Sequence, residues 1–385
     1  MISGGKTVGF IDILLMILMM ALFVNIIMNK MRIKEPKDNI PRDQIPTVSV
    51  LIPTRNEARN IKACLNALAA QDHPNFEVIV VDDSSTDKTL EVANEIAINN
   101  NRIRLARGRE IAPHWIGKPY AAFQAAQASK GKYLLFLDAD VILNRKALTM
   151  MVSTAKKRDT GIVSMIPFQK KDGFIEGILA PFKYFHLFLL FPTYAMDWPW
   201  EPLAAYAHGQ CMMIERGAYK NIGGHSSGSE SIREGVNLAR TLKSKGGRIR
   251  LLSGASLARA KVHGKPPMLW EGLTRYLYSM AKRSPIGSIL LAILYFTLFV
   301  LPALKLMFLP FTMGFDKTQL ILPVAQILLG IVMFLTAVGS FGLTFGEALF
   351  LPLGALVWVG MFVKAILAVV SKQGIQWKGR TIHLK

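Results

Sequence analysis

The stretch Tyr133-Leu134-Leu135-Phe136-Leu137-Asp138-Ala139-Asp140 runs five apolar or aromatic residues directly into two carboxylates that a single alanine separates. A short apolar run of this kind is typical of a buried strand in a parallel sheet, although a buried helix can give the same pattern. Ligand sites in open α/β sheets lie at the carboxyl ends of strands, which is where Asp138 and Asp140 fall. Two carboxylates this close resist joint ionisation unless a cation joins them, and Mg²⁺ binds through one or two carboxylates plus phosphate oxygens. The alternative is a solvated turn in which either aspartate caps a following helix.

The surrounding sequence alternates between two periodicities. Strand patterns cover residues 47–53, 76–81 and 103–106, and helical patterns cover 58–71, 88–99 and 120–129. Strands that alternate with helices at this spacing predict right-handed βαβ units, and therefore an α/β fold on a mainly parallel sheet.

Acidic residues also follow two of the other predicted strands. Glu57 comes just after the first strand, and Asp82 and Asp83 end the second. Each residue taken singly could be a turn former or a helix cap. Because all of them fall at strand ends, they predict a nucleotide site in which carboxylates bind hydroxyl groups and a metal binds the diphosphate.

Four apolar segments are close to the length of about 20 residues that crosses a bilayer. They cover residues 8–28, 286–311, 320–338 and 347–370. The first is followed by basic residues rather than by a small-residue cleavage site, so we predict a retained anchor instead of a signal peptide. The predicted domains are an anchor at 1–29, a basic linker at 30–46, an α/β domain at 47–284, a membrane region at 285–371 and a basic tail at 372–385. Within the α/β domain we predict a donor half at 47–145 and an acceptor half at 146–284.

The formal net charge of +20 is concentrated beside the apolar segments, at residues 30–37, 282–283 and 372–385. Nucleic acid is not expected as a partner, because no aromatic-and-basic recognition motif accompanies the charge. Juxtamembrane Lys and Arg mark the cytoplasmic side and are attracted to anionic lipid. We therefore predict a multi-pass protein of the cell membrane with its α/β domain in the cytoplasm. The two cysteines, Cys64 and Cys211, have no metal-ligand spacing, and a disulfide framework is not expected.

The predicted topology contains one conflict. Three spans after a cytoplasmic domain would place the C-terminus outside, whereas the basic residues 377–385 favour the cytoplasm. We expect one segment within 320–370 to be re-entrant or to lie in the membrane interface.

Three stretches together resemble the nucleotide-sugar-binding half of inverting family 2 glycosyltransferases, which have the GT-A fold. They are Val48-Ser-Val-Leu-Ile-Pro-Thr-Arg-Asn-Glu57, Val78-Ile-Val-Val-Asp-Asp-Ser-Ser-Thr-Asp87 and Leu137-Asp-Ala-Asp140. The resemblance covers roughly residues 47–284. The flanking membrane segments, together with residues 115–118 and 377–380, are similar to a bacterial membrane branch that includes carotenoid, hopanoid-associated and ceramide-type glycosyltransferases.

The resemblance implies roles for individual residues. The uridine of a UDP-sugar would contact Pro53, Arg55, Glu57 and Asp83. Asp138 and Asp140 would contact the ribose, the sugar and a Mg²⁺ or Mn²⁺ ion, with Asp140 also counted as catalytic, and Lys118 would lie near the donor.

The acceptor side departs from the family at the catalytic base. Inverting transfer requires a base for the acceptor hydroxyl and a cation for the departing diphosphate. In the family the base is the aspartate of a Glu-Asp or Asp-Asp pair before a Leu-Ala-Arg helix. Here Glu234 occupies the first place and Gly235 stands where the base would be. Either Glu234 acts as the base in a shifted loop, with Glu230 a poorer candidate, or catalysis is weak or absent.

A second departure concerns the Gln-x-x-Arg-Trp motif of processive polysaccharide synthases. The nearest match, Gly272-Leu-Thr-Arg275-Tyr276, keeps only the arginine and an aromatic residue. Arg275 would still hold the donor diphosphate. The loss argues against polymerisation and favours transfer of one hexose, glucose by resemblance, to a lipid hydroxyl or carboxylate. A polysaccharide synthase and a non-catalytic nucleotide-sugar-binding relative are the competing interpretations.

The lipid would enter through residues 177–196, which are rich in Phe, Tyr and Leu but interrupted by Pro181 and Pro192. This pattern predicts an interfacial segment at the bilayer surface, and a plain buried helix is the alternative. His208 is a weaker candidate site residue, since a lone histidine is more often structural. His263 and Lys265 are possible phosphate neighbours.

Overall fold

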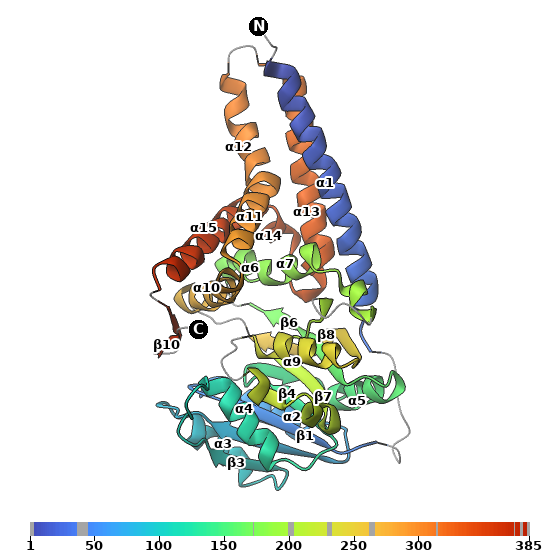
Figure 1. The fold of residues 1–385 in the computed structure, drawn as a ribbon, viewed down its shortest axis with the longest axis vertical. Coiled ribbons are helices and arrows are strands. Elements are labelled where there is room, and N and C mark those ends of the chain that lie inside the picture. Colours follow the sequence, from blue (N-terminus) through green and yellow to red (C-terminus); the bar gives the residue numbers. More distant parts are fainter. Residues whose placement is uncertain are drawn as a thin grey trace. The chain divides into compact units, whose positions relative to one another are not determined.

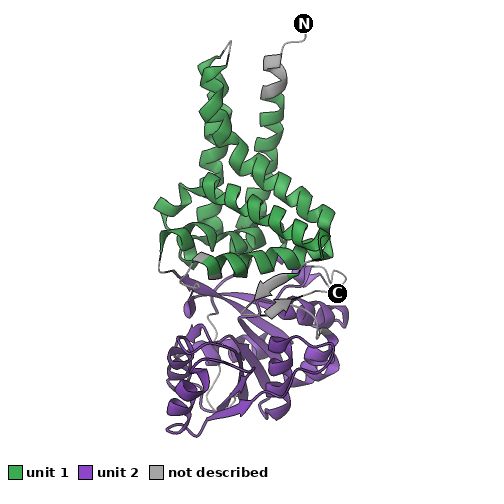
Figure 2. Cartoon of the chain, turned by 90° about the vertical axis from the view of Figure 1, so that its left-hand side faces the viewer, with its two compact units in different colours: residues 1–32, 171–192, 262–384 green, residues 33–170, 193–261, 385 purple. Residues whose placement is uncertain are grey.

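The computed structural model describes residues 4–36, 45–171, 173–198, 204–228, 233–261, 266–312, 315–372, 374–377 and 380–382. The chain divides into two compact units (Figure 2). Unit 1 consists of Met1–Arg32, Lys171–Pro192 and Val262–Leu384, and unit 2 consists mainly of Ile33–Lys170 and Thr193–Lys261. The α/β domain predicted at 47–284 is therefore divided, because residues 171–192 and 262–284 pack with the apolar helices of unit 1.

Unit 2 is built on an eight-stranded sheet with the strand order β3-β2-β1-β4-β7-β6-β8-β5. The strands are β1 (Val48–Thr54), β2 (Phe76–Asp82), β3 (Ile103–Arg107), β4 (Tyr133–Leu137), β5 (Val141–Leu143), β6 (Ile162–Lys170), β7 (Cys211–Glu215) and β8 (Ile249–Lys261). The first four strands in this order are parallel, whereas β7 is antiparallel to both β4 and β6. The α/β prediction is thus confirmed: the half that carries the acidic strand ends is wholly parallel, and the other half is mixed, with β6 and β8 also parallel.

Helices flank this sheet (Figure 1). They are α2 (Ile61–Ala69), α3 (Thr89–Ala97), α4 (Gly117–Ala128), α5 (Ala147–Lys157), α8 (Arg216–Asn221) and α9 (Glu234–Ser244), with 3₁₀ turns η2 (Thr193–Asp197) and η4 (Gly224–Gly228). Helix α4 begins three residues before the predicted start at 120, because Pro119 lies in the first turn, where a missing N–H has no intrahelical partner to lose. All five residues of β4 are buried, as expected for a central strand covered on both faces.

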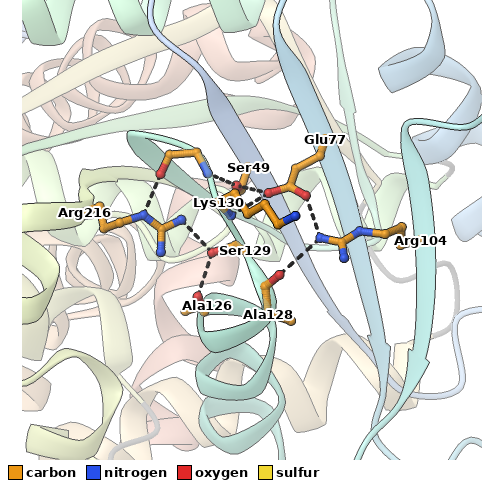
Figure 3. Close-up of polar contacts among 9 residues, drawn as sticks. Ser49, Glu77, Arg104, Ala126, Ala128, Ser129, Lys130 and Arg216 are labelled. Atoms are coloured by element: carbon orange, nitrogen blue, oxygen red, sulfur yellow. Dashed lines mark hydrogen bonds and ion pairs between the residues drawn. The ribbon is translucent and has the colours of Figure 1, made fainter.

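A polar network closes the amino-terminal edge of the sheet (Figure 3). The Glu77 carboxylate accepts hydrogen bonds from Ser49 Oγ at 2.6 Å, Lys130 N at 2.7 Å and Arg104 Nη2 at 2.6 Å. On the other side, Arg216 donates to the carbonyl of Gly131 at 2.7 Å and to Ser129 Oγ at 2.9 Å. Burial by itself raises the pKa of Glu77, but these donors outweigh it and lower the pKa below its usual value. This edge is occupied by structural contacts, which leaves the carboxyl edge for ligands.

Unit 1 contains helices α1 (Gly4–Arg32), α6 (Phe174–Leu179), α7 (Phe182–Leu190), α10 (Pro266–Arg283), α11 (Pro285–Tyr295), α12 (Leu301–Phe308), α13 (Ile321–Val338), α14 (Phe345–Ala348) and α15 (Leu351–Val370). Shorter turns are η5 (Phe296–Val300), η6 (Leu309–Phe311), η7 (Lys317–Leu320) and η8 (Gly339–Phe341), and β9 (Ile375–Trp377) pairs with β10 (Arg380–Ile382).

Four helical segments within the described residues are long and apolar enough to cross a membrane: Gly9–Arg32, Pro285–Phe311, Lys317–Phe341 and Leu351–Val370. They coincide with the four apolar segments of the sequence and indicate membrane association. Helices α1 and α13 run alongside each other, whereas α15 runs obliquely to them (Figure 1). The expectation that one segment of 320–370 does not cross the bilayer remains a prediction, and the oblique course of α15 is consistent with it.

Helix α7 lies inside unit 1 rather than on its surface. Phe182, Phe185 and Phe188 are fully buried, and α7 packs against α1 and α13. The side-chain amide of Asn29, on α1, donates to the Phe188 carbonyl at 2.9 Å and the Phe191 carbonyl at 2.7 Å, which satisfies the carboxyl end of α7. The buried-helix alternative therefore describes α7 itself. The exposed apolar side chains that an interfacial segment needs are found on α6, just before the predicted segment.

Candidate functional site

The two aspartates of the opening stretch lie where the sequence places them, at the carboxyl end of β4. The peptide N–H of Asp138 donates to the Gln210 carbonyl at 2.9 Å, and Val141 N donates to the Asp138 carbonyl at 3.0 Å, closing a tight turn. Strand β5 follows at once, so neither aspartate caps a helix and the capping alternative is excluded. Asp140 is 8 % exposed, and Gln210 Nε2 donates to its Oδ2 at 3.4 Å.

A lysine links this strand end to helix α9. Lys118 Nζ lies 2.7 Å from Asp138 Oδ1 and 2.8 Å from Glu234 Oε1. Lys118 is in the first turn of α4 and Glu234 is the first residue of α9, so three separate elements meet at one ammonium group. Burial alone lowers the pKa of Lys118, but attraction to Asp138 and then to Glu234 outweighs it and raises the pKa above its usual value. Lys118 is therefore a permanent cation between two carboxylates.

Gly235, at the position of the family's catalytic base, lies too close to neighbouring backbone for a side chain to fit. A Cβ atom at Gly235 would lie 2.7 Å from the carbonyl oxygen of Ala207 and 3.1 Å from the backbone nitrogen of Gly209. These are fixed backbone atoms, so no side chain fits at position 235 without moving the loop. Glu234, with its side chain 11 % exposed, is the carboxylate that α9 presents to Lys118. The alternative base Glu230 lies outside the described residues.

The residues expected to contact uridine lie at the end of β1 or on the loops after β1 and β2, at the same carboxyl edge. Arg55 Nη1 donates to the Asp83 carbonyl at 2.9 Å, and Asp83 N donates to the Thr54 carbonyl at 2.8 Å. The Glu57 carboxylate accepts from Asn60 at 2.7 Å. Pro53 pairs in register with Val81 of β2. The two loops are thus tied together, which preorganises a surface for a ligand; the contacts of each residue with uridine remain predictions.

Other predicted residues fall elsewhere. Arg275 lies on α10 in unit 1, whereas the other predicted site residues that the structure describes belong to unit 2. His208 is buried, and its peptide N–H donates to Ser164 Oγ at 2.7 Å, which fixes the chain ahead of β7. His263 and Lys265 lie outside the described residues.

Sequence reasoning missed residues that support the site. Gln210 lies 70 residues from Asp140 in the sequence, and it contacts both aspartates because β4 and β7 pair antiparallel. No local pattern reports that pairing. His225 Nδ1 lies 2.9 Å from the Tyr219 hydroxyl, and its ring meets Phe136 of β4 edge-on at 4.6 Å between centroids. Burial, and then the charge of Lys118, lowers the pKa of His225 to about 3, so it is neutral at physiological pH.

The acidic strand end suits a divalent cation. Within the part of the chain that the structure describes, no group of three or more His, Cys, Asp or Glu residues could hold a metal by itself. Mg²⁺ does not need such a group, because it binds through one or two carboxylates and completes its shell with phosphate oxygens and water. Asp138 and Asp140 offer carboxylate oxygens on one turn, and the Asp138 side chain is 24 % exposed. The pair fits a metal that arrives with a diphosphate.

Comparisons with known proteins agree with this geometry. Residues 49–223 match the family model described as glycosyl transferase family 2. A 4,4'-diaponeurosporenoate glycosyltransferase of Staphylococcus haemolyticus is 27 % identical over 204 residues, which cover 51 % of this chain and 52 % of that protein. The glycosyltransferase AglE of Haloferax volcanii is 37 % identical over 112 residues, which cover 29 % of this chain and 36 % of AglE. The chain spans about half the length of the curated relatives it matches.

A solved structure shares the fold. The mannosyltransferase PcManGT from Pyrobaculum calidifontis, in complex with GDP-Man and Mn²⁺, aligns with a TM-score of 0.51 at 18 % identity, covering 93 % of this chain and 98 % of that one. The mixed sheet of unit 2 is accordingly of the GT-A type. Residues 49–223 therefore match glycosyl transferase family 2, and they lie within a domain of the GT-A fold.

Proposed function

We propose that this protein is a membrane-bound inverting glycosyltransferase that moves one hexose from a UDP-sugar to a lipid acceptor with the help of Mg²⁺ or Mn²⁺. The observation that carries the proposal is the meeting of Asp138 and Glu234 on Lys118, with Asp140 on the same turn. Carboxylates for a metal and a carboxylate able to accept a proton are thereby brought to one edge of a GT-A sheet.

The reaction forms a bond between an acceptor oxygen and the anomeric carbon and breaks the bond from that carbon to the diphosphate. Glu234 would accept the proton of an acceptor hydroxyl, since it is the carboxylate that α9 holds in the site. A divalent cation bound by Asp138 and Asp140 would supply positive charge for the departing diphosphate. Lys118 would add a second positive charge and hold Glu234 in place.

The lipid class of the acceptor rests on two supports. Four described helices are apolar enough to cross a membrane, so the chain is placed where lipids are available. The relatives from Staphylococcus are named for a carotenoid acid, which is an apolar molecule with a carboxylate. We propose a lipid hydroxyl or carboxylate as the acceptor, with the GT-A domain on the cytoplasmic side, where UDP-sugars are made.

The purified full chain in detergent, with labelled UDP-glucose, Mn²⁺ and a membrane lipid extract, tests this function. Label that moves into an organic-extractable lipid supports the proposal. Label in a polymer would instead identify a polysaccharide synthase. Binding of UDP-glucose without any transfer would identify a non-catalytic relative, and either of these two outcomes overturns the proposal.

A further inference from the structure

We propose that Lys118 is a built-in counter-ion that occupies Asp138 in the free protein, is displaced from it by the divalent cation, and thereby couples the donor side of the site to Glu234. The inference rests on the proposed function, because it concerns the order in which that site is filled. It gives Lys118 a positioning role in addition to its expected place near the donor.

The contacts of Lys118 connect the two sides of the site directly. Its Nζ lies 2.7 Å from Asp138 Oδ1 and 2.8 Å from Glu234 Oε1, which are charge-assisted hydrogen bonds at their usual length. An ammonium group has three N–H donors, so it can bind both carboxylates at once. Neither carboxylate can change its partner without altering how Lys118 holds the other.

A divalent cation competes for the same oxygen atoms. Mg²⁺ contacts its carboxylate ligands at about 2.1 Å, which is closer than an ammonium group approaches. A doubly charged ion on Asp138 would repel an ammonium that remained at hydrogen-bond distance from the same carboxylate. Lys118 therefore leaves Asp138 when the cation binds, and it stays with Glu234 or turns to the incoming phosphates.

The surroundings of Glu234 make this coupling matter. Gly235 cannot carry a second carboxylate, because the backbone of residues 207–209 fills the space where its side chain would lie. Glu234 makes a direct ion pair with Lys118, so a change in the partners of Lys118 alters the surroundings of the Glu234 carboxylate. The reaction would then be ordered. The metal and donor would bind first and release Lys118 from Asp138, and Glu234 would accept the proton of the acceptor hydroxyl afterwards.

The test is a titration of the full chain in detergent with Mn²⁺ alone, followed by calorimetry or by electron paramagnetic resonance. Lys118→Met should bind Mn²⁺ at least about tenfold more tightly than the natural protein, because the competitor for Asp138 is gone. Lys118→Arg keeps a cation at the position and should stay within about threefold of the natural protein. Lys62→Met, an exposed lysine on α2, is the matched control and should leave Mn²⁺ affinity unchanged.

Measurements at high salt distinguish direct competition for Asp138 from the general effect of removing one positive charge. The tighter binding of Lys118→Met should persist at about 0.5 M salt, where interactions between separated exposed charges are largely screened. Unchanged or weaker Mn²⁺ binding by Lys118→Met overturns the inference, and so does a Lys118→Met protein that binds no Mn²⁺. If Lys118→Met does not fold, Lys118→Gln takes its place with the same expected tightening. Label transfer to lipid is measured separately, so the proposed function can stand when this inference fails.

Discussion

Gly235 packs against Gly209 so closely that a Cβ atom at position 235 would lie 3.1 Å from the Gly209 nitrogen and 3.2 Å from its Cα. Gly209 immediately precedes Gln210, whose carbonyl and side chain contact the two aspartates of the β4 turn. The absence of the family's base at position 235 is therefore built into the packing of the loop beside the site. A glycine here allows α9 to begin close to the β4–β7 pair.

Gly235→Asp should lower stability without raising activity. The added side chain meets fixed backbone, and overpacking of this kind typically costs about 1–3 kcal/mol. Thermal unfolding in detergent, read with transfer assays, measures both effects. Gly217→Ala is the matched control, because a Cβ at this exposed position on α8 has nothing within 4 Å, and it should be neutral or slightly stabilising. A fully stable and more active Gly235→Asp protein would contradict the steric explanation.

Glu234→Gln should keep donor binding and lose transfer to hydroxyl acceptors. The amide fills the same space but cannot accept the proton, and general base catalysis is typically worth about 10²–10⁴ in rate. A carboxylate acceptor is already ionised, so transfer to it should fall much less. Rates with lipid alcohols and lipid acids, beside binding of UDP-glucose, check both statements. Glu91→Gln on α3 is the control for loss of an exposed acidic charge. Full activity of Glu234→Gln towards alcohols would show that the base lies elsewhere.

Asp140→Asn should weaken metal-dependent binding of the donor. The amide keeps the size of the side chain and its contact with Gln210, but it is a poor ligand for a hard cation. We expect a loss of at least about tenfold in UDP-glucose affinity with Mn²⁺ present, which corresponds to ~1.4 kcal/mol. Binding with excess chelator should differ little between the two proteins. Equal affinities in the presence of Mn²⁺ would remove Asp140 from the metal site.

Stability should fall as the pH drops from about 6.5 towards 4, the unfolded pKa of histidine being ~6.5. Burial first of all lowers the pKa of His73 to about 4, and burial with the charge of Lys118 lowers that of His225 to about 3. At pH values between the folded and the unfolded pKa the unfolded chain binds more protons, so the free energy of unfolding decreases as the pH is lowered through this window. For His73 the loss by pH 4 is roughly 2–4 kcal/mol.

His73→Gln should reduce this pH dependence, because the buried titrating group is gone. Melting temperatures measured from pH 7.5 to 4.5 are the readout. His114→Asn is the control, since His114 is exposed and its positive φ of 67° is one that asparagine tolerates. Identical slopes for the natural protein and His73→Gln would rule out a contribution from His73.

Asp12 of α1 and Lys305 of α12 form an ion pair, and removing one partner should lower stability more than removing both. Both side chains are largely buried in unit 1, and Gln326 of α13 donates to the Asp12 carbonyl at 3.1 Å. Asp12→Leu alone leaves a buried cation without its partner, and breaking such pairs costs about 3–5 kcal/mol. The double variant Asp12→Leu/Lys305→Met should recover much of the loss. Detergent unfolding of the single and double variants gives the coupling energy, and additive losses would contradict it.

The sequence predicted the donor half of unit 2 because its signals are local. Apolar strands that end in acidic residues gave the positions of β1, β2 and β4 to within a residue or two, and the four apolar helices followed from length and composition. The helix starts were less accurate at α2 and α4. The loop before α2 carries hydrogen bonds to residues about 30 positions away, which periodicity does not report, and α4 starts early because its first turn accommodates Pro119.

The acceptor half depended on contacts between distant segments. No local signal predicts that β7 enters antiparallel beside β4, that residues 171–192 pack with the apolar helices, or that α7 is buried. These follow from which surfaces remain unpaired once the sheet and the helices have formed, and that is a property of the whole chain.

The chain's own order of residues thus determined that Asp138 and Asp140 end a buried strand, because five apolar residues must be covered on both faces and the first polar residues after them must emerge at its end. It also determined that position 235 has no base, since glycine has no side chain. Only the tertiary structure decided why no side chain fits there, and which carboxylate lies beside Lys118. Lys118 and Glu234 are 116 residues apart in the sequence, and they meet because α4 and α9 both begin beside the end of β4. A charge contact between elements so distant is fixed by packing alone.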